Sequence, residues 1–331
     1  MPTVLGSVRR LLMAPTLADV TFARRGFPGP ATEVTRRLEA VPQSVICGFE
    51  WGIDTRDPWE LERRLALVDR ELLGFAYEGA TMACTILDVM GPRRGTRTRD
   101  LLRGPGAPHL FLAYIGIGFA MARLPRRFWR HVVPDLTGNP YHPTMTWLAV
   151  DGYGFDRAYF DLDRWVTRQE RLAAYPWQGH GDYFARATDQ GLGRALWFIH
   201  GARTADVAGA VRAFASDRHG DLWSGVGLAA TFAGGADAEA LVALRAAAGP
   251  CAPDLAQGAV FAAKARSHAG HVPAHSEAAM HALGGRSVAA VAALADDVAV
   301  RAEDAGRLPA YEVWRRNVRA HFEPADVGHD R

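Results

Sequence analysis

The most constraining feature of this sequence is an internal similarity between its two halves. Around Gln43 and again around Gln190, an apolar helical segment is followed by a capped helix and a second segment rich in small residues. The separation of matching residues falls from 147 at this pair to 142 at Gly116 and Gly258. Because loop deletions in a second copy would shrink the separation steadily, the pattern predicts a duplicated unit of about 140 residues, too long for a solenoid repeat. A likeness of composition alone is the alternative.

The duplication predicts two helical halves that pack face to face about a pseudo-dyad into one body, with a cleft at their junction. The expected units are an N-terminal arm and first helix over residues 1–42, a first half over 43–180, a second half over 181–322 and a tail over 323–331.

Helix signals occur along almost the whole chain. Asp57 precedes Pro58 and Glu60, which is typical of a capped helix start, and Thr204 is expected to cap a corresponding helix in the second half. Alternation with a period of two, typical of strands, is scarce. The sequence therefore predicts an all-α protein, with further helices at about 31–40, 75–89, 107–123, 144–150, 156–174, 185–199, 222–233, 237–248, 253–269, 275–283, 286–304 and 310–321.

Composition limits the classes of partner. The chain has 331 residues, of which 49% are apolar, so it can build a full core. The formal net charge is +2 and the basic residues are spread along the chain, so the basic stripe of a nucleic-acid-binding protein is missing. Nucleic acid is therefore not an expected partner, and a homodimer stays open.

Cysteine usage and apolar segments bear on the compartment. The three cysteines form no close pair, which favours a reducing cytoplasm. Residues 110–122 are the longest apolar stretch, and a span of the bilayer needs about 20 such residues. We expect a buried helix there and a cytoplasmic protein, with association at a membrane surface as the alternative.

Three carboxylates are candidates for acid–base catalysis. Glu50 and Glu78 have the most apolar neighbours in the sequence, and burial among apolar groups raises the pKa of a carboxyl group. Asp161 and Asp163 resemble half of an acid motif that protonates alkenes, although Arg164 stands where a third carboxylate would be. A structural ion-pair network is the alternative for this segment.

Arg194 follows the string Asp189-Gln-Gly-Leu-Gly and precedes apolar residues. The string lacks a preceding strand and a third glycine, so the dinucleotide fingerprint fails and no cofactor is predicted. An arginine in such company needs an acidic partner, for which Asp189 and Glu50 are the candidates.

The histidines at 268, 271, 275 and 281 are dense enough to suggest zinc. Gly270 and Pro273 break the helical spacing that would align two of them, so no metal site is predicted. Lys264 is the only lysine of the chain, and a side chain that reaches solvent from an exposed helix face is favoured over a catalytic amine.

Four strings are similar to segments of one known family. They are G-F-A-Y-E-G-A at 74–80, D-G-Y-G-F-D-R-A-Y-F at 151–160, D-Q-G-L-G-R-A-L-W-F at 189–198 and L-A-Q-G-A-V-F-A-A-K-A-R at 255–266. The chain resembles a bacterial domain-of-unknown-function family common in actinobacteria. Its members are typically described as enediyne biosynthesis proteins and are encoded beside the iterative polyketide synthase of enediyne clusters.

The resemblance implies a cytoplasmic accessory protein that encloses an apolar polyene and helps to cyclise or mature it. The family has no assigned catalytic residue, so the sites remain those argued from the sequence. Trp51, Tyr77, Trp147, Tyr153 and Trp197, with Arg194, are the expected substrate-binding residues. A non-catalytic partner that docks on the polyketide synthase, or on membrane proteins of the same pathway, is the alternative.

Overall fold

The computed structural model describes residues 16–55, 57–91 and 95–323 and is all-helical over these residues, which confirms the predicted class. The α-helices are α2 (Phe22–Arg25), α3 (Glu33–Asp54), α4 (Pro58–Leu65), α5 (Leu73–Met90), α6 (Arg97–Arg103), α7 (Leu110–Arg123), α8 (Trp147–Phe160), α9 (Phe184–Ile199), α10 (Thr204–Ala213), α11 (His219–Ala233), α12 (Ala238–Ala248), α13 (Ala252–His268), α14 (Ala274–Gly284), α15 (Val288–Asp297) and α16 (Ala310–Ala320). Short 3₁₀ or π turns lie between them, among them η1 (Leu17–Val20), η2 (Ala107–His109) and η5 (Asp163–Thr167).

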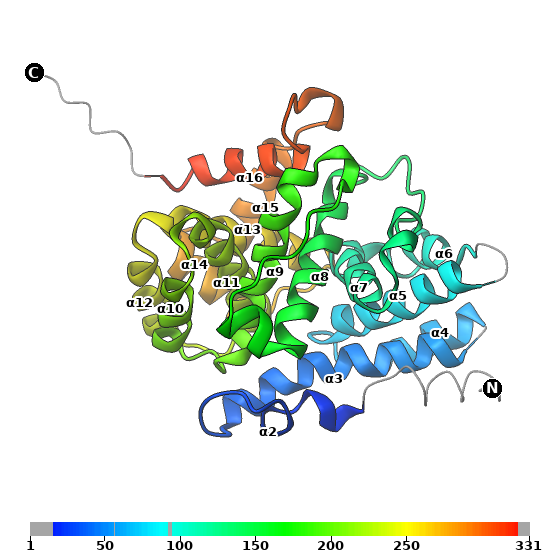
Figure 1. Cartoon of the computed structure of the whole chain (residues 1–331), viewed down its shortest axis with the longest axis horizontal. Helices are drawn as coiled ribbons and strands as arrows, with labels where there is room; N and C mark the ends of the chain where they lie inside the picture. The colour runs from blue at the N-terminus through cyan, green and yellow to red at the C-terminus, as the bar shows by residue number, and fades with distance from the viewer. Residues whose placement is uncertain (1–15, 56, 92–94, 324–331) are drawn as a thin grey trace, which may run out of the picture.

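Seven long helices form the centre of the molecule as one continuous row. Each packs against the next in the order α3, α5, α7, α8, α9, α11, α13, and in Figure 1 the labels α5, α7, α8, α9 and α11 follow one another across the molecule. The row curls, since Phe75 of α5 meets Phe232 of α11 and Phe111 of α7 meets Phe261 of α13, with ring centroids 5.2 and 5.6 Å apart. The shorter helices lie around this row.

Paired glycines set the distance between the central helices. A Cβ on Gly225 of α11 would lie 1.9 Å from the carbonyl oxygen of Gln190 on α9, and one on Gly227 would lie 2.0 Å from that of Leu255 on α13. Only glycine permits this approach. The same arrangement, with the first glycine facing the preceding helix and the second facing the following one, occurs at Gly116 and Gly118, Gly152 and Gly154, and Gly191 and Gly193.

The regularity that the structure shows is therefore one helix long. Successive Gly-x-Gly pairs are 34–39 residues apart in the sequence. Their two glycines point to opposite sides because two residues of an α-helix correspond to about 200° of rotation. The duplication of about 140 residues is not confirmed and stays a prediction, and residue 42, where the arm was expected to end, lies inside α3.

The ends of α4, α8 and α10 agree with the sequence predictions only in part. Asp57 caps α4 as expected, accepting a hydrogen bond of 3.0 Å from the backbone N–H of Trp59. Thr204 is the first residue of α10, and Arg203 stands at the cap instead. The separation of the helices expected at 144–150 and 156–174 was wrong, because the glycines between them serve helix contacts and α8 is continuous from Trp147 to Phe160.

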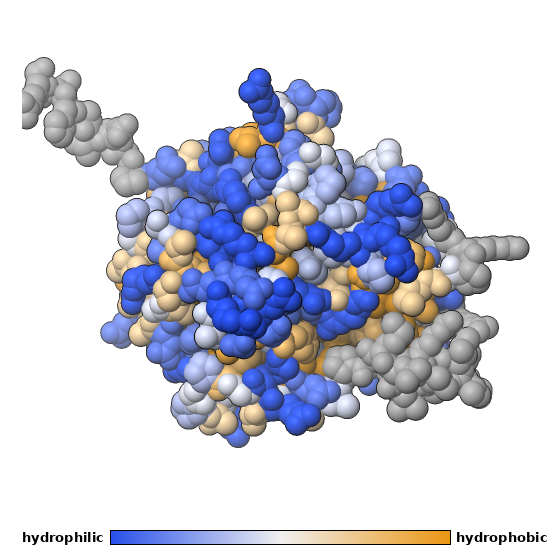
Figure 2. Space-filling view, viewed as in Figure 1, coloured by the Kyte–Doolittle hydropathy of each residue, from blue (hydrophilic) through white to orange (hydrophobic). Residues whose placement is uncertain are grey.

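The apolar residues are concentrated inside this helical body. One large buried cluster extends from Val20 to Val318, and a smaller one surrounds Leu65. In the face shown in Figure 2, hydrophilic residues predominate and hydrophobic ones are scattered. In the described part of the chain, no single helix is long and apolar enough to cross a bilayer. Two pairs of helices, each bent at a short break, have the necessary length and apolar composition when taken together: Arg97–Arg103 with Ala107–Arg123, and Ala274–Gly284 with Val288–Asp297.

Candidate active site

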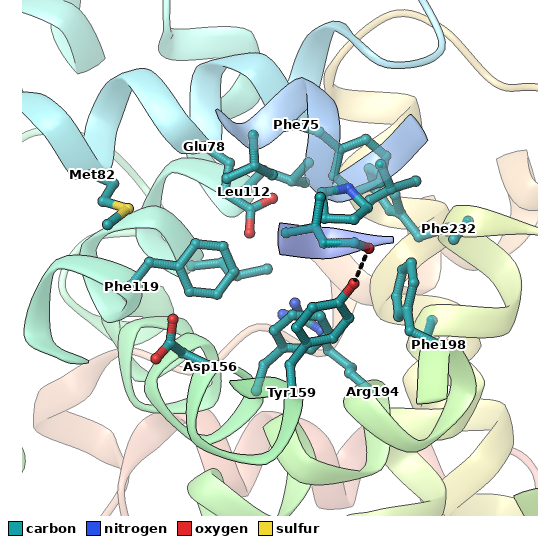
Figure 3. Close-up of a pocket in the computed structure, with 18 of the residues that line it drawn as sticks. Phe75, Glu78, Met82, Leu112, Phe119, Asp156, Tyr159, Arg194, Phe198 and Phe232 are labelled. Carbon is teal, nitrogen blue, oxygen red and sulfur yellow. Dashed lines mark hydrogen bonds between the residues drawn. The ribbon is translucent and has the colours of Figure 1, made fainter. Parts of the chain in front are cut away.

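The concave side of the helix row encloses an apolar cavity. Its empty space, including its mouth, is about 960 Å³, but the centre of a water molecule can reach only about 80 Å³ of it, so the cavity is narrow. All seven central helices contribute to the wall, as does Val20 of η1. Figure 3 shows side chains of α5, α7, α8, α9 and α11 pointing toward this space. The aromatic members of the wall are Phe49, Phe75, Phe119, Phe155, Tyr159, Phe160, Phe198, Phe232 and Phe261.

Glu78 is the carboxylate that faces this cavity without a partner. It lies on α5 one residue before Gly79, is 2% exposed, and forms no hydrogen bond or ion pair with any residue that the structure describes. Burial raises the pKa of Glu78 to about 8; the positive charge of Arg194 opposes this rise and the negative charge of Asp151 adds to it. Glu78 is therefore mostly protonated at neutral pH. Because its pKa lies close to that pH, the carboxyl group can both give up and take back a proton.

Arg194 of α9 is a buried cation in the wall of this cavity. Its guanidinium donates to the carboxylate of Asp151 at 2.5 Å and lies over the ring of Phe155, 4.9 Å from the centroid. Asp151 also accepts a hydrogen bond of 2.8 Å from the side chain of Gln190. The partner of Arg194 is thus Asp151 of α8, whereas Asp189 and Glu50 had been expected. Asp189 pairs with Arg218 at 2.5 Å instead.

A second ion pair and the N-terminal segment lie at the cavity wall. Arg123 at the end of α7 pairs with Asp156 of α8, whose side chain is buried while that of Arg123 is partly exposed. Tyr159 donates a hydrogen bond of 2.9 Å to the carbonyl oxygen of Val20, drawn as the dashed line in Figure 3. Arg25 of α2 in turn donates to the carbonyl oxygen of Tyr159 at 2.8 Å. These bonds fasten η1 and α2 over one side of the cavity.

Comparison with known proteins identifies the family. The model of the family described as Protein of unknown function (DUF1702) matches residues 4–322, nearly the whole chain. The chain belongs to the DUF1702 family. No curated protein and no solved structure matches it. The predicted resemblance to a family of unknown function is confirmed to this extent.

Two of the nine predicted site residues of this DUF1702 protein reach the cavity, Glu78 and Arg194. Glu50 of α3 is half-buried and lies outside the wall, although Phe49 beside it belongs to the wall. Asp161 is the exposed residue that ends α8. Its neighbours form exposed ion pairs, Arg164 with Glu170 at 2.6 Å and Arg168 with Asp163 at 3.0 Å, as in the structural alternative.

The predicted aromatic residues lie apart from the cavity and do not form a single group. Trp147 and Trp197 are fully buried in the core, where Trp147 packs on Tyr183 and Trp197 donates to the carbonyl oxygen of Gly234 at 2.9 Å. Tyr77 stacks on His109 with ring centroids 4.6 Å apart. Tyr77 belongs to the smaller buried cluster, against which Trp51 also packs. Tyr153 packs edge-on against Trp129.

Cavity-lining residues of the central helices recur at two positions of the helix repeat, and at these two positions sequence reasoning found only Arg194. Counted from the first glycine of each pair, the residue three positions later faces the cavity: Phe119, Phe155, Arg194, Leu228 and, after Gly258, Phe261. The residue seven positions later does so at Arg123, Tyr159, Phe198, Phe232 and Ala265. Aligning the Gly-x-Gly pairs would have found both rows, because three, four and seven residues separate neighbours on one helix face.

The remaining chemically interesting residues make structural contacts. Lys264 pairs with Asp296 at 2.6 Å. His268 and His275 bond carbonyl oxygens of Ala107 and Phe232, both at 3.2 Å. Within the described residues, no three histidine, cysteine or acidic side chains are grouped closely enough to hold a metal ion.

Proposed function

We propose that this protein encloses an apolar polyene in the central cavity and isomerises or cyclises it by moving protons, with Glu78 as acid and base. The observation that carries this proposal is the position of Glu78, a buried carboxyl group without a partner, facing a narrow apolar cavity with many aromatic side chains. A narrow apolar wall suits a long, thin hydrocarbon, because each buried CH₂ group contributes about 0.8 kcal/mol.

The proposed reaction conserves atoms and electrons. The carboxylic acid of Glu78 gives its proton to one carbon of a double bond, whose electron pair forms the new C–H bond and leaves a cation along the conjugated chain. In a cyclisation, an internal double bond attacks this cation and its electron pair forms the carbon–carbon bond that closes the ring. Loss of a proton from a neighbouring carbon to the Glu78 carboxylate regenerates a double bond and the acid, so the product is an isomer of the substrate.

The wall supports the intermediate cation of this reaction. Phe155 stacks on Tyr159 at 5.4 Å and meets Phe198 edge-on at 5.6 Å, and Phe119 lies 5.8 Å from Phe155. The face of an aromatic ring attracts a cation by about 0.5–2 kcal/mol. Arg194 is held by Asp151, so its charge is balanced and does not by itself repel the cation.

The resemblance of the four sequence strings to enediyne biosynthesis proteins suggests the pathway. We infer an accessory step in the formation of an enediyne-type polyketide, in which the polyene released by an iterative synthase is the substrate. Apolar substrate, buried acid and aromatic wall are compatible with this step.

The test is Glu78→Gln, incubated with the polyene that the synthase makes. Removal of the proton donor is expected to reduce product formation at least about 100-fold while polyene binding persists, because general acid–base catalysis contributes roughly 10²–10⁴-fold. Glu239→Gln, on the exposed side of α12, is the control. Undiminished turnover by Glu78→Gln would contradict the proposal. It would favour the docking alternative, in which the protein co-purifies with the synthase or with membrane proteins of the pathway.

A further inference from the structure

A second cavity adjoins the apolar one. Its empty space, including its mouth, is about 670 Å³, and it shares Leu112, Phe232 and Ala265 with the central cavity. Its other walls come from the first turns of α5 and α7 and from the last turn of α13. Its titratable residues are Arg70, His109, Arg266 and His271, and no aspartate or glutamate among the residues that the structure describes lines it.

Arg266 is a buried cation whose charge no carboxylate balances directly. It is 3% exposed and forms no ion pair with any described residue. Its two terminal nitrogens donate to the carbonyl oxygens of Glu71 and Phe232 at 2.8 and 2.7 Å, while its Nε has no partner. The carboxylate of Glu71 lies 3.5 Å from His275 instead. Burial lowers the pKa of Arg266 to about 10, so it stays charged at neutral pH.

Burying an arginine without a counter-charge is costly. Its contact with the face of Phe232, 3.9 Å from the centroid, and its two carbonyl bonds offset part of that cost. The Nε–H lies within the packed wall, but the charge of Arg266, which lines the cavity and has no carboxylate partner among the described residues, remains as an attraction for an anion there.

The rest of the second cavity also favours an anion. No side chain caps the first turn of α5, where Leu73 and Gly74 line the cavity, or that of α7, where His109 stands at the cap. The N–H groups of Phe75, Ala76 and Leu110 already donate to backbone carbonyl oxygens, so what these two first turns offer an anion is the positive end of the helix dipole. Burial lowers the pKa of His109 to about 4, so at neutral pH its ring is uncharged and can donate one hydrogen bond.

We propose that the second cavity binds the anionic head group, a carboxylate or a phosphate, of an amphiphile whose apolar chain occupies the central cavity. Arg266 carries the recognition, and Arg70 and the first turns of α5 and α7 assist it. The inference rests on the proposed function in one respect, that the central cavity holds an apolar chain. It adds that the natural substrate has a charged end, as a polyene acid or a polyene phosphate does.

The experiment compares three probes with the same chain, namely decanoate, decyl phosphate and decan-1-ol, by titration calorimetry below the micelle concentrations of the two anions and the solubility limit of the alcohol. At least one anion is expected to bind the wild-type protein about 10-fold or more tighter than the alcohol, which is the effect of one charge-assisted hydrogen bond in a buried site. The stronger anion identifies the head group. Arg266→Gln is expected to remove the preference while changing the affinity for the alcohol less than about threefold.

Two further variants complete the design. Arg70→Gln, at an exposed position of the cavity edge, is expected to weaken anion binding a few-fold and needs no repacking of the core. Arg245→Gln, on the exposed side of α12, is the control with the same change of charge and is expected to bind like the wild type.

Equal affinity of the wild type for the alcohol and both anions would overturn the head-group site and leave the apolar cavity supported. The same conclusion follows if Arg266→Gln, shown to be folded by circular dichroism, keeps the preference for an anion. Failure of the alcohol itself to bind would count against the proposed function.

Discussion

At the scale of single residues, two buried glutamates show how neighbours decide the state of a carboxyl group. Glu78 faces apolar side chains and has a pKa raised to about 8. For Glu312 of α16, burial alone would raise the pKa, but Arg315, Arg186 and Arg319 outweigh it and lower the pKa to about 2. One group is therefore suited to proton transfer, and the other is a permanent anion that holds the structure together.

The raised pKa of Glu78 makes stability depend on pH in a defined direction. Between its ordinary value of 4.5 and about 8, Glu78 binds a proton in the folded state but not in the unfolded state. Below pH 4.5 Glu78 is protonated in both states and its burial costs no ionisation energy. As the pH rises toward 8, the free energy of unfolding falls by about 1.4 kcal/mol per pH unit, up to about 5 kcal/mol in total.

We expect Glu78→Gln and the wild type to have similar free energies of unfolding at pH 4. At pH 9 the variant should be more stable by several kcal/mol, measured by urea denaturation. A difference that stays constant from pH 4 to pH 9 would show that the pKa of Glu78 is not raised.

Sequence reasoning could find Glu78 because its neighbours along the chain are apolar. It also proposed Glu50 on the same ground, and that residue is half-buried outside the cavity. Apolar neighbours in sequence surround a helix on all sides, so they cannot tell which side chain points into a cavity. Sequence reasoning also could not identify Asp151 as the partner of Arg194, because the two residues are 43 positions apart and meet only through the packing of α8 on α9.

At the scale of the helices, a Gly-x-Gly pair recurs in four consecutive central helices, α7, α8, α9 and α11. Each pair lets one helix approach two neighbours closely and leaves its two other sides for the cavity and the outer layer. The residues Gly116 and Gly258, whose match predicted a repeat of about 140 residues, lie on α7 and α13, four helices apart in the row, and the repeat itself stays a prediction. Similarity between two segments fixes neither the size of the repeated unit nor the number of copies.

The close approach predicts opposite effects of the same substitution at two glycines. Gly225→Ala places a Cβ 1.9 Å from the carbonyl oxygen of Gln190, so α9 and α11 must separate, and we expect a loss of about 2 kcal/mol or more in the free energy of unfolding. Gly209→Ala, in α10, meets no atom within 4 Å and should stabilise the protein by about 0.5–1 kcal/mol. Thermal unfolding of both variants measures the difference. Equal shifts would mean that the α9–α11 contact tolerates a methyl group.

At the scale of the whole molecule, α16 is bonded to three central helices. Arg315, which is fully buried, donates to Asp221 of α11 at 2.7 Å and to Gln257 of α13 at 3.0 Å. Tyr311 exchanges hydrogen bonds with Gln190 of α9, which also bonds Asp151. One polar network therefore runs from α16 to the ion pair of Arg194 at the cavity wall, so the last helix and the site are mechanically joined.

This network predicts how the protein responds to acid. The pKa of Glu312 is lowered from 4.5 to about 2, so its stabilisation is fully present above pH 4.5 and is lost as the pH falls toward 2. The difference corresponds to about 3 kcal/mol. Glu312→Gln should therefore destabilise the protein by about that amount at pH 7, because Arg315 loses one of its two anionic neighbours in a buried site.

The difference in free energy of unfolding between the wild type and Glu312→Gln should become smaller as the pH falls from 4.5 to 2. The urea midpoint of each protein at each pH measures it. Glu33→Gln removes an exposed carboxylate that pairs with Arg37 and should change stability by less than about 0.5 kcal/mol at any of these pH values. If Glu312→Gln and Glu33→Gln lose the same stability at pH 7, the network around α16 does not stabilise the folded state. If the Glu312→Gln variant also loses the affinity for decan-1-ol, while folded, then the cavity depends on α16 through Gln190 and Asp151.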